Sequence, residues 1–551
     1  MIFINKKKAL TYIFLLSIVI LSFSKSIYFA IHNTDPLHSN LVFFDSYKKL
    51  QGESFYKDIL IIYGPIATLF NTLCLSLFGK FVLSLSLGTA IIYSSSFIIY
   101  YFILANLRFS KKNSLIIILL VFIIHPGIVL PWANYLSYFF LLLAFLLFSL
   151  PSNKNLSFFL FGILLGLAAL SRQTILFPIF LFLLSTFFFN KLKTKKLYIL
   201  FGLSFVILVF FLYLLFNNLV ELWVLQSFKI WTIYTYKDFH PLISETLGYL
   251  NYLILIKDLL SKLLFSFVNL DFKWIFYFLL MTFNIFFLIS SFFYKKNYQK
   301  EYKLVLISTI SIFLFSEAIH INEIFRLSTG AIIGLIPLYF YLSNLSKKFI
   351  TNLNYRNFFF LYCFYPLLLF FFMTFIYTLN KSYQNYKFIL NINKVLSEPK
   401  ISFLKFQRFP IEVSNFYEKF NFEIKKIHSL YKIDYNYNFS DNALLPIISD
   451  TKSFRMSSFY NYKGLGYPDY FVNFYNYYPA LRFSEISRNK FSNVMVFVLV
   501  KDKYELNRHK ENFNFDHFFI FSEMNYPFHD KNKILLILMP NNVNKLTMLN
   551  F

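Results

Sequence analysis

Residues 6–31 read KKKALTYIFLLSIVILSFSKSIYFAI, and this stretch decides the class of fold. The apolar run from Ala9 to Ile31 is long enough to cross a bilayer as a helix, which takes about 20 residues. Three lysines precede the run, and it lacks the shorter apolar segment and the Ala-x-Ala-like site of a cleaved signal peptide. We therefore predict an uncleaved anchor with a cytoplasmic N-terminus.

The rest of the chain continues this pattern. Of its 551 residues, 57% are hydrophobic and only 15% are charged, whereas globular domains have about 25% charged residues. This composition excludes a single soluble domain. We predict a mainly α, polytopic plasma-membrane bundle of about eleven transmembrane helices over residues 1–379. After the first run, the apolar runs are residues 81–107, 114–124, 135–150, 158–170, 175–189, 197–216, 274–293, 304–315, 327–342 and 358–379.

The charges separate by side of the membrane. The net charge is +26. Threading the apolar runs alternately through a bilayer collects the lysines and arginines of the membrane part on one side, where Glu301 is the one accompanying acid. Cytoplasmic loops carry such a basic excess, so the acidic loops are predicted to face outward. Topology thus accounts for the basic excess of the membrane part, a Lys-rich outer domain supplements it, and no nucleic-acid partner is predicted.

Residues 380–551 are polar and rich in Asn and Tyr. They contain an amphipathic stretch at 411–430 and strand-like apolar runs at 493–500, 517–521 and 533–539. We predict a soluble, extracytoplasmic α/β domain at the C-terminus.

The first outer loop, residues 32–80, holds three aspartates, Asp35, Asp45 and Asp58, close to the bilayer. A half-desolvated carboxylate at such a place is suited to taking a proton from an acceptor hydroxyl or amine. The alternative is a solvated loop with ordinary turn residues, and residue chemistry alone leaves both interpretations open.

Three features of this loop resemble the GT-C superfamily of membrane glycosyltransferases, in particular its family 39, protein-mannosyltransferase-like branch. They are an Asp soon after the first helix, Gly52 followed by Tyr56-Lys57-Asp58, and a Gly-Pro that opens the next hydrophobic stretch. The resemblance implies a polyprenyl-phosphate sugar donor and a first-loop acid as base. Asp35 matches that base and Asp58 the Tyr-x-Asp acid, while Asp45 competes for the role.

The resemblance also assigns substrate contacts. The family's Asp-Glu pair is replaced here by Asp35-Pro-Leu-His38, and we assign His38 and Tyr56 to substrate binding. Arg172 lies between two apolar runs, where membrane glycosyltransferases of this type often place a basic residue near the lipid phosphate. A guanidinium suits a phosphate as a bidentate partner, and the alternative is an Arg that reaches out to lipid headgroups.

A short outer turn, residues 317–326, packs several ionisable side chains between two apolar runs. His320 and Arg326 would neutralise the departing phosphate, and Glu317 or Glu323 would hold them or a sugar hydroxyl. The alternative is interhelical salt bridging. Further metal-ligand spacing is absent, so the sequence supports no divalent metal and we predict no cofactor.

Several enzyme signatures are missing from the sequence, including a Walker loop, a Gly-rich dinucleotide turn and His-Glu-x-x-His. Both cysteines, Cys74 and Cys363, lie in apolar runs, which favours neither a disulfide framework nor a cysteine metal site. We predict an inverting glycosyltransferase that moves a sugar from a polyprenyl-phosphate carrier to an acceptor glycan, lipid or protein. The alternatives are a polymerase or ligase of lipid-linked glycans, and a flippase or transporter.

Overall fold

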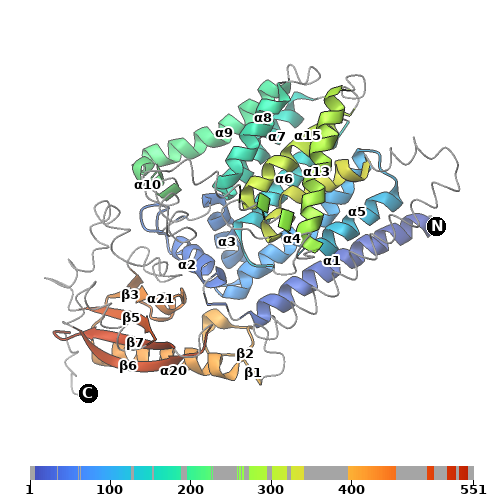
Figure 1. Ribbon diagram of the computed structural model, residues 1–551. Helices are drawn as coiled ribbons and strands as arrows, with labels where there is room; N and C mark the ends of the chain where they lie inside the picture. The colour runs from blue at the N-terminus through green and yellow to red at the C-terminus, as the bar shows by residue number, and fades with distance from the viewer. Residues whose placement is uncertain are drawn as a thin grey trace, which may run out of the picture.

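The computed structural model describes residues 6–227 and 272–340 of the membrane part, each with short gaps, and a few positions between 257 and 265. It also describes residues 395–453, 493–501, 518–528 and 533–543 of the C-terminal part. Figure 1 shows a helical bundle with a smaller sheet-containing domain at one end.

Helices dominate the membrane part. They are α1 (Lys6–His32), α2 (His38–Leu50), α3 (Pro65–Phe78), α4 (Val82–Asn106), α5 (Lys111–Ile124), α6 (Ala133–Ser149), α7 (Asn155–Ser171), α8 (Leu176–Thr186), α9 (Lys195–Phe216), α10 (Val220–Val224), α13 (Phe272–Phe293), α15 (Tyr302–Phe313) and α16 (Ile324–Ser328). Three short 3-10 helices adjoin them: η1 (Gln173–Ile175), η5 (Leu314–Ala318) and η6 (Ala331–Gly334).

Helix is present at each of the first ten apolar runs, and the eleventh, residues 358–379, lies outside the described part. Within that part, four helices are long and apolar enough to cross a membrane: α1 from Ala9, α4, α9 and α13 from Trp274 to Ser291. Five shorter apolar helices accompany them. The fold is that of a multi-pass membrane protein, and the total of about eleven spans stays a prediction.

The loop predicted over residues 32–80 is largely helical, since it contains α2 and α3. Pro65 is the first residue of α3, where its missing N–H costs nothing, and Gly64 precedes it in extended conformation. Both helices are too short to satisfy a criterion based on runs of about 20 apolar residues. Their residues 42–44, 74 and 75 belong to a hydrophobic cluster shared with the C-terminal domain.

Helices α7 and α9 pack closely because both carry glycine at their contact. A Cβ atom added at Gly162 would lie 2.1 Å from the carbonyl oxygen of Ile199, and one added at Gly202 would lie 2.0 Å from that of Phe159. Small residues that allow such close backbone approach are typical of helix pairs in membranes.

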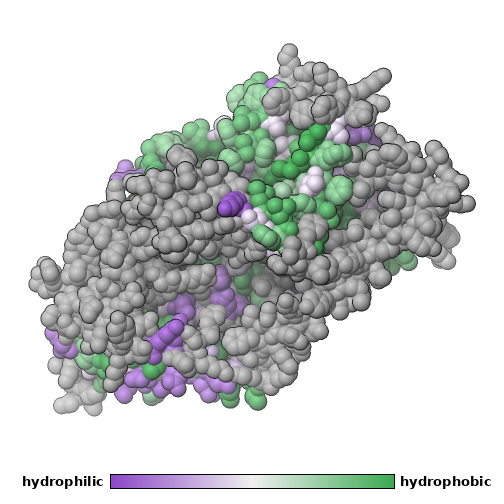
Figure 2. All heavy atoms as spheres, viewed as in Figure 1, coloured by the Kyte–Doolittle hydropathy of each residue, from purple (hydrophilic) through white to green (hydrophobic). Residues whose placement is uncertain are grey.

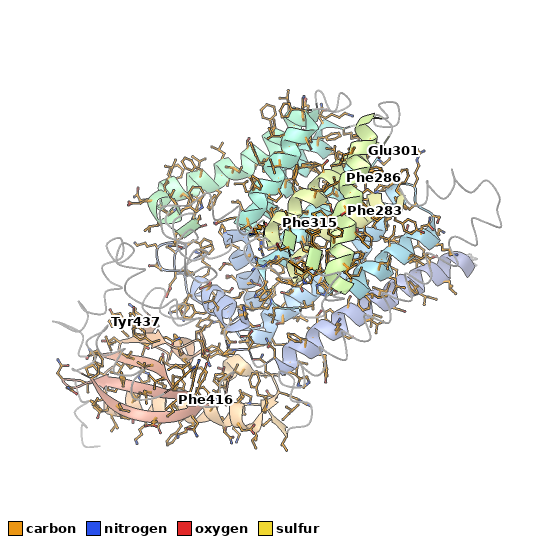
Figure 3. The ribbon with its side chains drawn as sticks, in the orientation of Figure 1. Phe283, Phe286, Glu301, Phe315, Phe416 and Tyr437 are labelled. Atoms are coloured by element: carbon orange, nitrogen blue, oxygen red, sulfur yellow. The ribbon has the colours of Figure 1, made fainter. Side chains whose placement is uncertain are left out.

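The two ends of the bundle differ in charge. At one end, the Lys303 ammonium donates to the carbonyls of Ser149 and Leu150 at 3.1 and 2.9 Å, and Lys195 begins α9. Figure 3 shows Glu301 at that end, far from the C-terminal domain. The acidic first loop lies at the opposite end, which agrees with the alternation of charges threaded from the sequence.

The C-terminal domain is α/β, as predicted. Its five-stranded sheet has the order β4-β3-β5-β7-β6, with parallel pairing of β3 to β4 and β5 and antiparallel pairing among β5, β7 and β6. The strands are β3 (Tyr435–Phe439), β4 (Lys452–Ser453), β5 (Val494–Val500), β6 (Phe518–Tyr526) and β7 (Lys533–Pro540). A short hairpin of β1 (Leu396–Ser397) and β2 (Phe409–Pro410) precedes α20 (Ile411–Leu430), and α21 (Leu445–Ile448) follows β3.

Helix α20 covers one face of this sheet. Alternate residues of the buried strand β5 point to the two faces, with Phe497 toward α20 and Val496 away from it. The Phe497 ring lies 5.1 Å from that of Phe420. Figure 3 labels Phe416 on the α20 side and Tyr437, which belongs to the cluster on the other face.

The C-terminal domain docks directly onto the first loop, residues 32–80. The Phe403 ring lies 6.0 Å from Phe43 and 5.3 Å from Tyr47, both in α2, and the Arg408 N–H donates to the Ile31 carbonyl at 2.9 Å. In Figure 2, hydrophobic residues gather over the bundle and hydrophilic ones over this domain, among the described residues of that face. The end of α1 therefore lies at the boundary between the two parts.

Candidate active site

Asp35 and His38 form a tight pair just after α1. The Asp35 Oδ2 atom lies 2.6 Å from His38 Nδ1, and Oδ1 accepts the backbone N–H of His38 at 3.3 Å. The Asn33 side chain accepts the Asp35 N–H at 3.0 Å and so fixes the turn. The carboxylate thus lies at the N-terminus of α2, where the helix dipole favours a negative charge. The side chains are 21% and 32% exposed, respectively.

Two aromatic rings link this pair to elements that are distant in the sequence. The Trp132 ring, just before α6, meets the His38 ring edge-on at 5.0 Å. The Phe325 ring, in α16, lies 4.5 Å from that of Trp132. The next residue, Arg326, is 9% exposed. The outer turn predicted to act on the phosphate therefore reaches the first-loop pair through two rings.

The C-terminal domain places several polar groups in the region of the pair. The buried Tyr526 hydroxyl donates to the Asp441 carboxylate, and the buried Tyr417 hydroxyl accepts from Asn442 at 3.1 Å. Burial, with a further contribution from the charges of Asp441 and Asp35, raises the pKa of Tyr526 well above its ordinary value. Because Asp35 influences this hydroxyl electrostatically, the two parts of the chain share one polar region.

Asp45 lies seven residues beyond His38 in α2, two turns along the same face of the helix and about 10 Å further along its axis. The structure gives its carboxylate no hydrogen-bond or ion-pair partner within the described part of the chain. Burial raises the pKa of Asp45 well above its ordinary value. Asp45 nevertheless has intermediate exposure, so solvent still reaches part of this residue.

Asp58 and Tyr56 shape the far end of the first loop. Asp58 Oδ2 accepts the backbone N–H of Ser54 at 2.9 Å, which closes the turn. Tyr56 is 1% exposed and packs near Phe210 of α9, and its carbonyl accepts from the Gln226 side chain at 2.7 Å. These contacts give both residues an evident structural role, and their predicted parts in catalysis and substrate binding stay predictions.

Gly64 joins the first loop to the end of α7. Its N–H donates to the Ser171 carbonyl at 2.9 Å, and an added Cβ atom would lie only 1.7 Å from the Leu170 carbonyl oxygen. Only glycine permits this approach. The Gly-Pro noted in the sequence thus brings the loop beside Arg172.

Arg172 lies in a closed network of polar side chains. It forms an ion pair with Glu317 and donates to the side chains of Asn134 and Thr174, the latter at 2.8 Å. The Thr174 hydroxyl in turn donates to Glu317 at 2.9 Å. The side chains of the ion pair are only 4% and 3% exposed. The network therefore ties the start of α6 and the end of α7 to η5.

The segment from Trp132 to Asn134 contacts both groups, since Trp132 packs on His38 and Asn134 binds Arg172. The structure thereby brings Asp35, His38, Arg172 and Arg326 to one end of the bundle. His320 and Glu323 lie outside the described residues. Sequence reasoning missed Glu317 as the partner of Arg172, although the cost of an unpaired charge at membrane depth required a partner of some kind.

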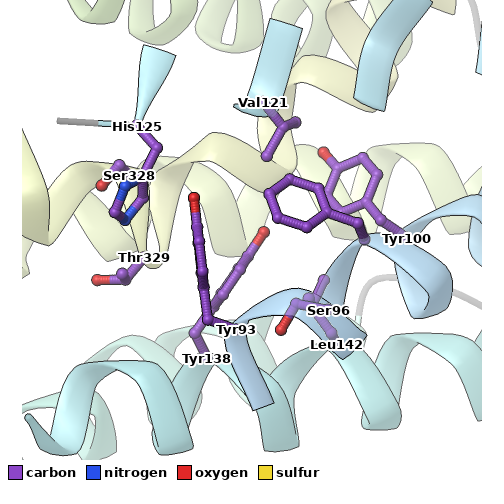
Figure 4. Close-up of a pocket in the computed structure, with 10 residues that line it drawn as sticks. Tyr93, Ser96, Tyr100, Val121, His125, Tyr138, Leu142, Ser328 and Thr329 are labelled. Atoms are coloured by element: carbon purple, nitrogen blue, oxygen red, sulfur yellow. The ribbon is translucent and has the colours of Figure 1, made fainter. Parts of the chain in front are cut away.

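A small, mostly apolar cavity lies beside Ser328 at the end of α16 (Figure 4). It is lined by groups that include His125, Tyr138, Ser328 and Thr329, and the Tyr135 hydroxyl lies 3.1 Å from His125 Nε2. Its volume is about 20 Å³, and a water molecule requires roughly 10 to 15 Å³ on the same measure. The cavity has room for about one water molecule and none for a sugar.

In the described part of the chain, His, Cys, Asp and Glu side chains form no group of three or more that could hold a metal ion. The absence of a cofactor stays a prediction.

No protein-family model matches the sequence, and no curated protein matches it. The crystal structure of ArnT from Cupriavidus metallidurans in the apo state is similar to this chain, with a TM-score of 0.52 and 10% sequence identity. The similarity covers 97% of this chain and 98% of that chain. At this identity the match shows the fold alone, and the predicted architecture of a helical membrane bundle with a C-terminal domain is that of an ArnT-like fold.

Proposed function

We propose that the protein is an integral-membrane, inverting glycosyltransferase that takes a sugar from a polyprenyl-phosphate carrier and passes it to an acceptor on the outer face of the membrane. The observation that carries this proposal is the Asp35–His38 pair, with its 2.6 Å contact, at the boundary between the bundle and the C-terminal domain. The fold shared with ArnT over 97% of the chain supports a lipid-linked sugar as donor.

The reaction needs a proton acceptor beside the attacking oxygen. An acceptor hydroxyl attacks the anomeric carbon, the bond from that carbon to the phosphate oxygen breaks, and its electron pair leaves with the polyprenyl phosphate. The hydroxyl proton passes to the Asp35–His38 pair. A positioned base of this kind contributes about 10²- to 10⁴-fold to a rate. Attack opposite the leaving phosphate inverts the anomeric configuration.

The departing phosphate needs positive charge at the same place. Arg326 supplies it in this proposal, because the Phe325 and Trp132 rings connect its helix to His38. Preorganised charge at a leaving oxygen is worth about 3 to 4 kcal/mol per group. Arg172 is already neutralised by Glu317, and we assign it to holding the helix ends in position. His320 would add a second donor to the phosphate.

Variants of the first-loop acids test the proposal. Sugar transfer from labelled polyprenyl-phosphate sugars is measured with purified protein and membrane acceptors, in Asp35→Asn, Asp45→Asn and Asp58→Asn proteins of verified folding. The proposal predicts a loss of about 10²- to 10⁴-fold in Asp35→Asn and a smaller loss in Asp58→Asn, whose carboxylate closes a turn. Full activity of Asp35→Asn would remove the pair from the chemistry. A large loss in Asp45→Asn alone would transfer the role to Asp45.

A further inference from the structure

We infer that His38, rather than Asp35, accepts the proton, and that Asp35 is the group that orients the His38 ring. The inference rests on the proposed glycosyl transfer and divides the work within the pair. It starts from the contact between Asp35 Oδ2 and His38 Nδ1 at 2.6 Å.

The Asp35 carboxylate is poorly suited to act as the base itself. Its Oδ2 atom is engaged by the His38 ring, and its Oδ1 atom accepts the His38 backbone N–H at 3.3 Å. Hydrogen bonds to the charged form of a carboxylate, and a position at a helix N-terminus, both favour the ionised state. Both carboxylate oxygens of Asp35 are thus engaged by His38.

The imidazole of His38 is better suited to the task. An unperturbed imidazole titrates at about pH 6.5, close to the working range in which general bases are most effective. The His38 side chain is 32% exposed and that of Asp35 21%, so the ring is the more accessible of the two. Trp132 holds the ring edge-on at 5.0 Å, which limits its rotation.

The two ring nitrogens then have separate functions. When Nδ1 donates to Asp35, the neutral ring carries its lone pair on Nε2, on the opposite edge. The acceptor hydroxyl gives its proton to Nε2 as its oxygen forms the new glycosidic bond, and the electron pair of the broken anomeric bond leaves with the phosphate. Asp35 stabilises the imidazolium, which later returns its proton to water.

Other charged groups around the pair favour or oppose the protonated form of the His38 ring. Asp441 from the C-terminal domain adds a second negative charge in the region of Asp35, which favours the imidazolium. Asp45 lies further along α2, and because burial raises its pKa and so favours its neutral form, it adds little negative charge. Arg326, next to Phe325 in α16, carries a positive charge that opposes the imidazolium. The hydroxyls of Tyr417 and Tyr526 stay neutral, because burial raises the pKa of each above its ordinary value.

The test is the pH dependence of kcat/KM for transfer from a labelled polyprenyl-phosphate sugar. In the wild type, kcat/KM rises with pH through the range in which an imidazole loses its proton. His38→Gln loses about 10²- to 10⁴-fold and the pH dependence disappears. Asp35→Asn keeps part of the activity, with the rise moved to lower pH. His428→Gln is the matched control, because His428 binds the Ser449 carbonyl in the C-terminal domain, and it behaves as the wild type.

The opposite pattern would overturn the inference: wild-type activity in His38→Gln together with an inactive Asp35→Asn makes Asp35 the base. A second readout separates this outcome from failure of the proposed function. NMR of ring-¹⁵N-labelled histidine, assigned with His38→Gln, should show the His38 titration midpoint lower in Asp35→Asn than in the wild type. Equal midpoints refute the orienting pair. A lowered midpoint without sugar transfer by the wild type leaves the pair intact and refutes the glycosyltransferase.

Discussion

Removing one partner of the Arg172–Glu317 ion pair should destabilise the bundle strongly. The two side chains are 4% and 3% exposed, so neither charge is solvated when the other is lost. A buried pair broken on one side costs about 3 to 5 kcal/mol, whereas replacing both partners by apolar residues of similar size is often neutral. We therefore expect Arg172→Met and Glu317→Leu each to lower the free energy of unfolding by about 3 to 5 kcal/mol.

The double variant shows whether Arg172 and Glu317 stabilise the fold as a coupled pair or as two independent residues. With both charges removed, the loss should be smaller than the sum of the two single losses by at least about 2 kcal/mol, since residues in one network couple by up to about 3 kcal/mol. Unfolding is measured by denaturant titration of the purified protein in detergent. Arg108→Ala is the control, because Arg108 is exposed, and surface changes stay within about 0.5 kcal/mol. Additive losses in the free energy of unfolding, or an Arg172→Met variant as stable as the wild type, would refute the coupling of this ion pair.

Three further predictions concern the first loop and its surroundings. Burial raises the pKa of the Asp45 carboxyl above its value in the unfolded chain, so the folded state loses stability as the pH rises and this proton is released. Asp45→Asn should therefore have a higher Tm than the wild type at pH 8, and the difference in Tm should narrow toward pH 4. Gly64→Ala should cost about 1 to 3 kcal/mol and reduce transfer, since its Cβ would meet the Leu170 carbonyl at 1.7 Å, whereas Gly330→Ala, with contacts no closer than 3.6 Å, should cost less in the same unfolding assay. Tyr526→Phe should cost about 1 kcal/mol in denaturant titration by removing the hydroxyl that donates to Asp441, and an unchanged midpoint would contradict this contact.

Local apolar patterns in the sequence predicted many of the helices and strands. The amphipathic stretch at residues 411–430 matches α20 to the residue, because its apolar spacing reports the face buried against the sheet. The three apolar strand-like runs of the C-terminal part became β5, β6 and β7. Strand β3 was missed, since its buried Asn436 and Asn438 interrupt the apolar pattern and find their partners only in the folded domain.

The candidate site depends on contacts that no local pattern contains. The Thr174 hydroxyl and Glu317 are 143 residues apart in sequence and meet only when η1 and η5 pack together. The approach of Trp132 to His38 likewise depends on the placement of α6. Sequence reasoning placed Asp35, His38, Arg172 and Arg326 at the ends of apolar runs, and the resemblance to membrane glycosyltransferases singled out Asp35 and Arg172; the roles of all four stay predictions. It could not identify Asp441 and Tyr526, because nothing in the sequence indicates how the C-terminal domain docks.

The most direct test of the account is transfer itself. The purified wild-type protein in lipid nanodiscs is incubated with polyprenyl-phosphate sugars that carry a radiolabel in the sugar, and membranes from the source cells serve as acceptor. The product is detected by autoradiography, and its anomeric configuration is determined by NMR. The account predicts that the label leaves the carrier with inversion of the anomeric configuration, and that Asp35→Asn combined with His38→Gln abolishes this transfer. A protein that moves the intact lipid-linked sugar across the bilayer, and leaves the bond from sugar to phosphate unbroken, would contradict it.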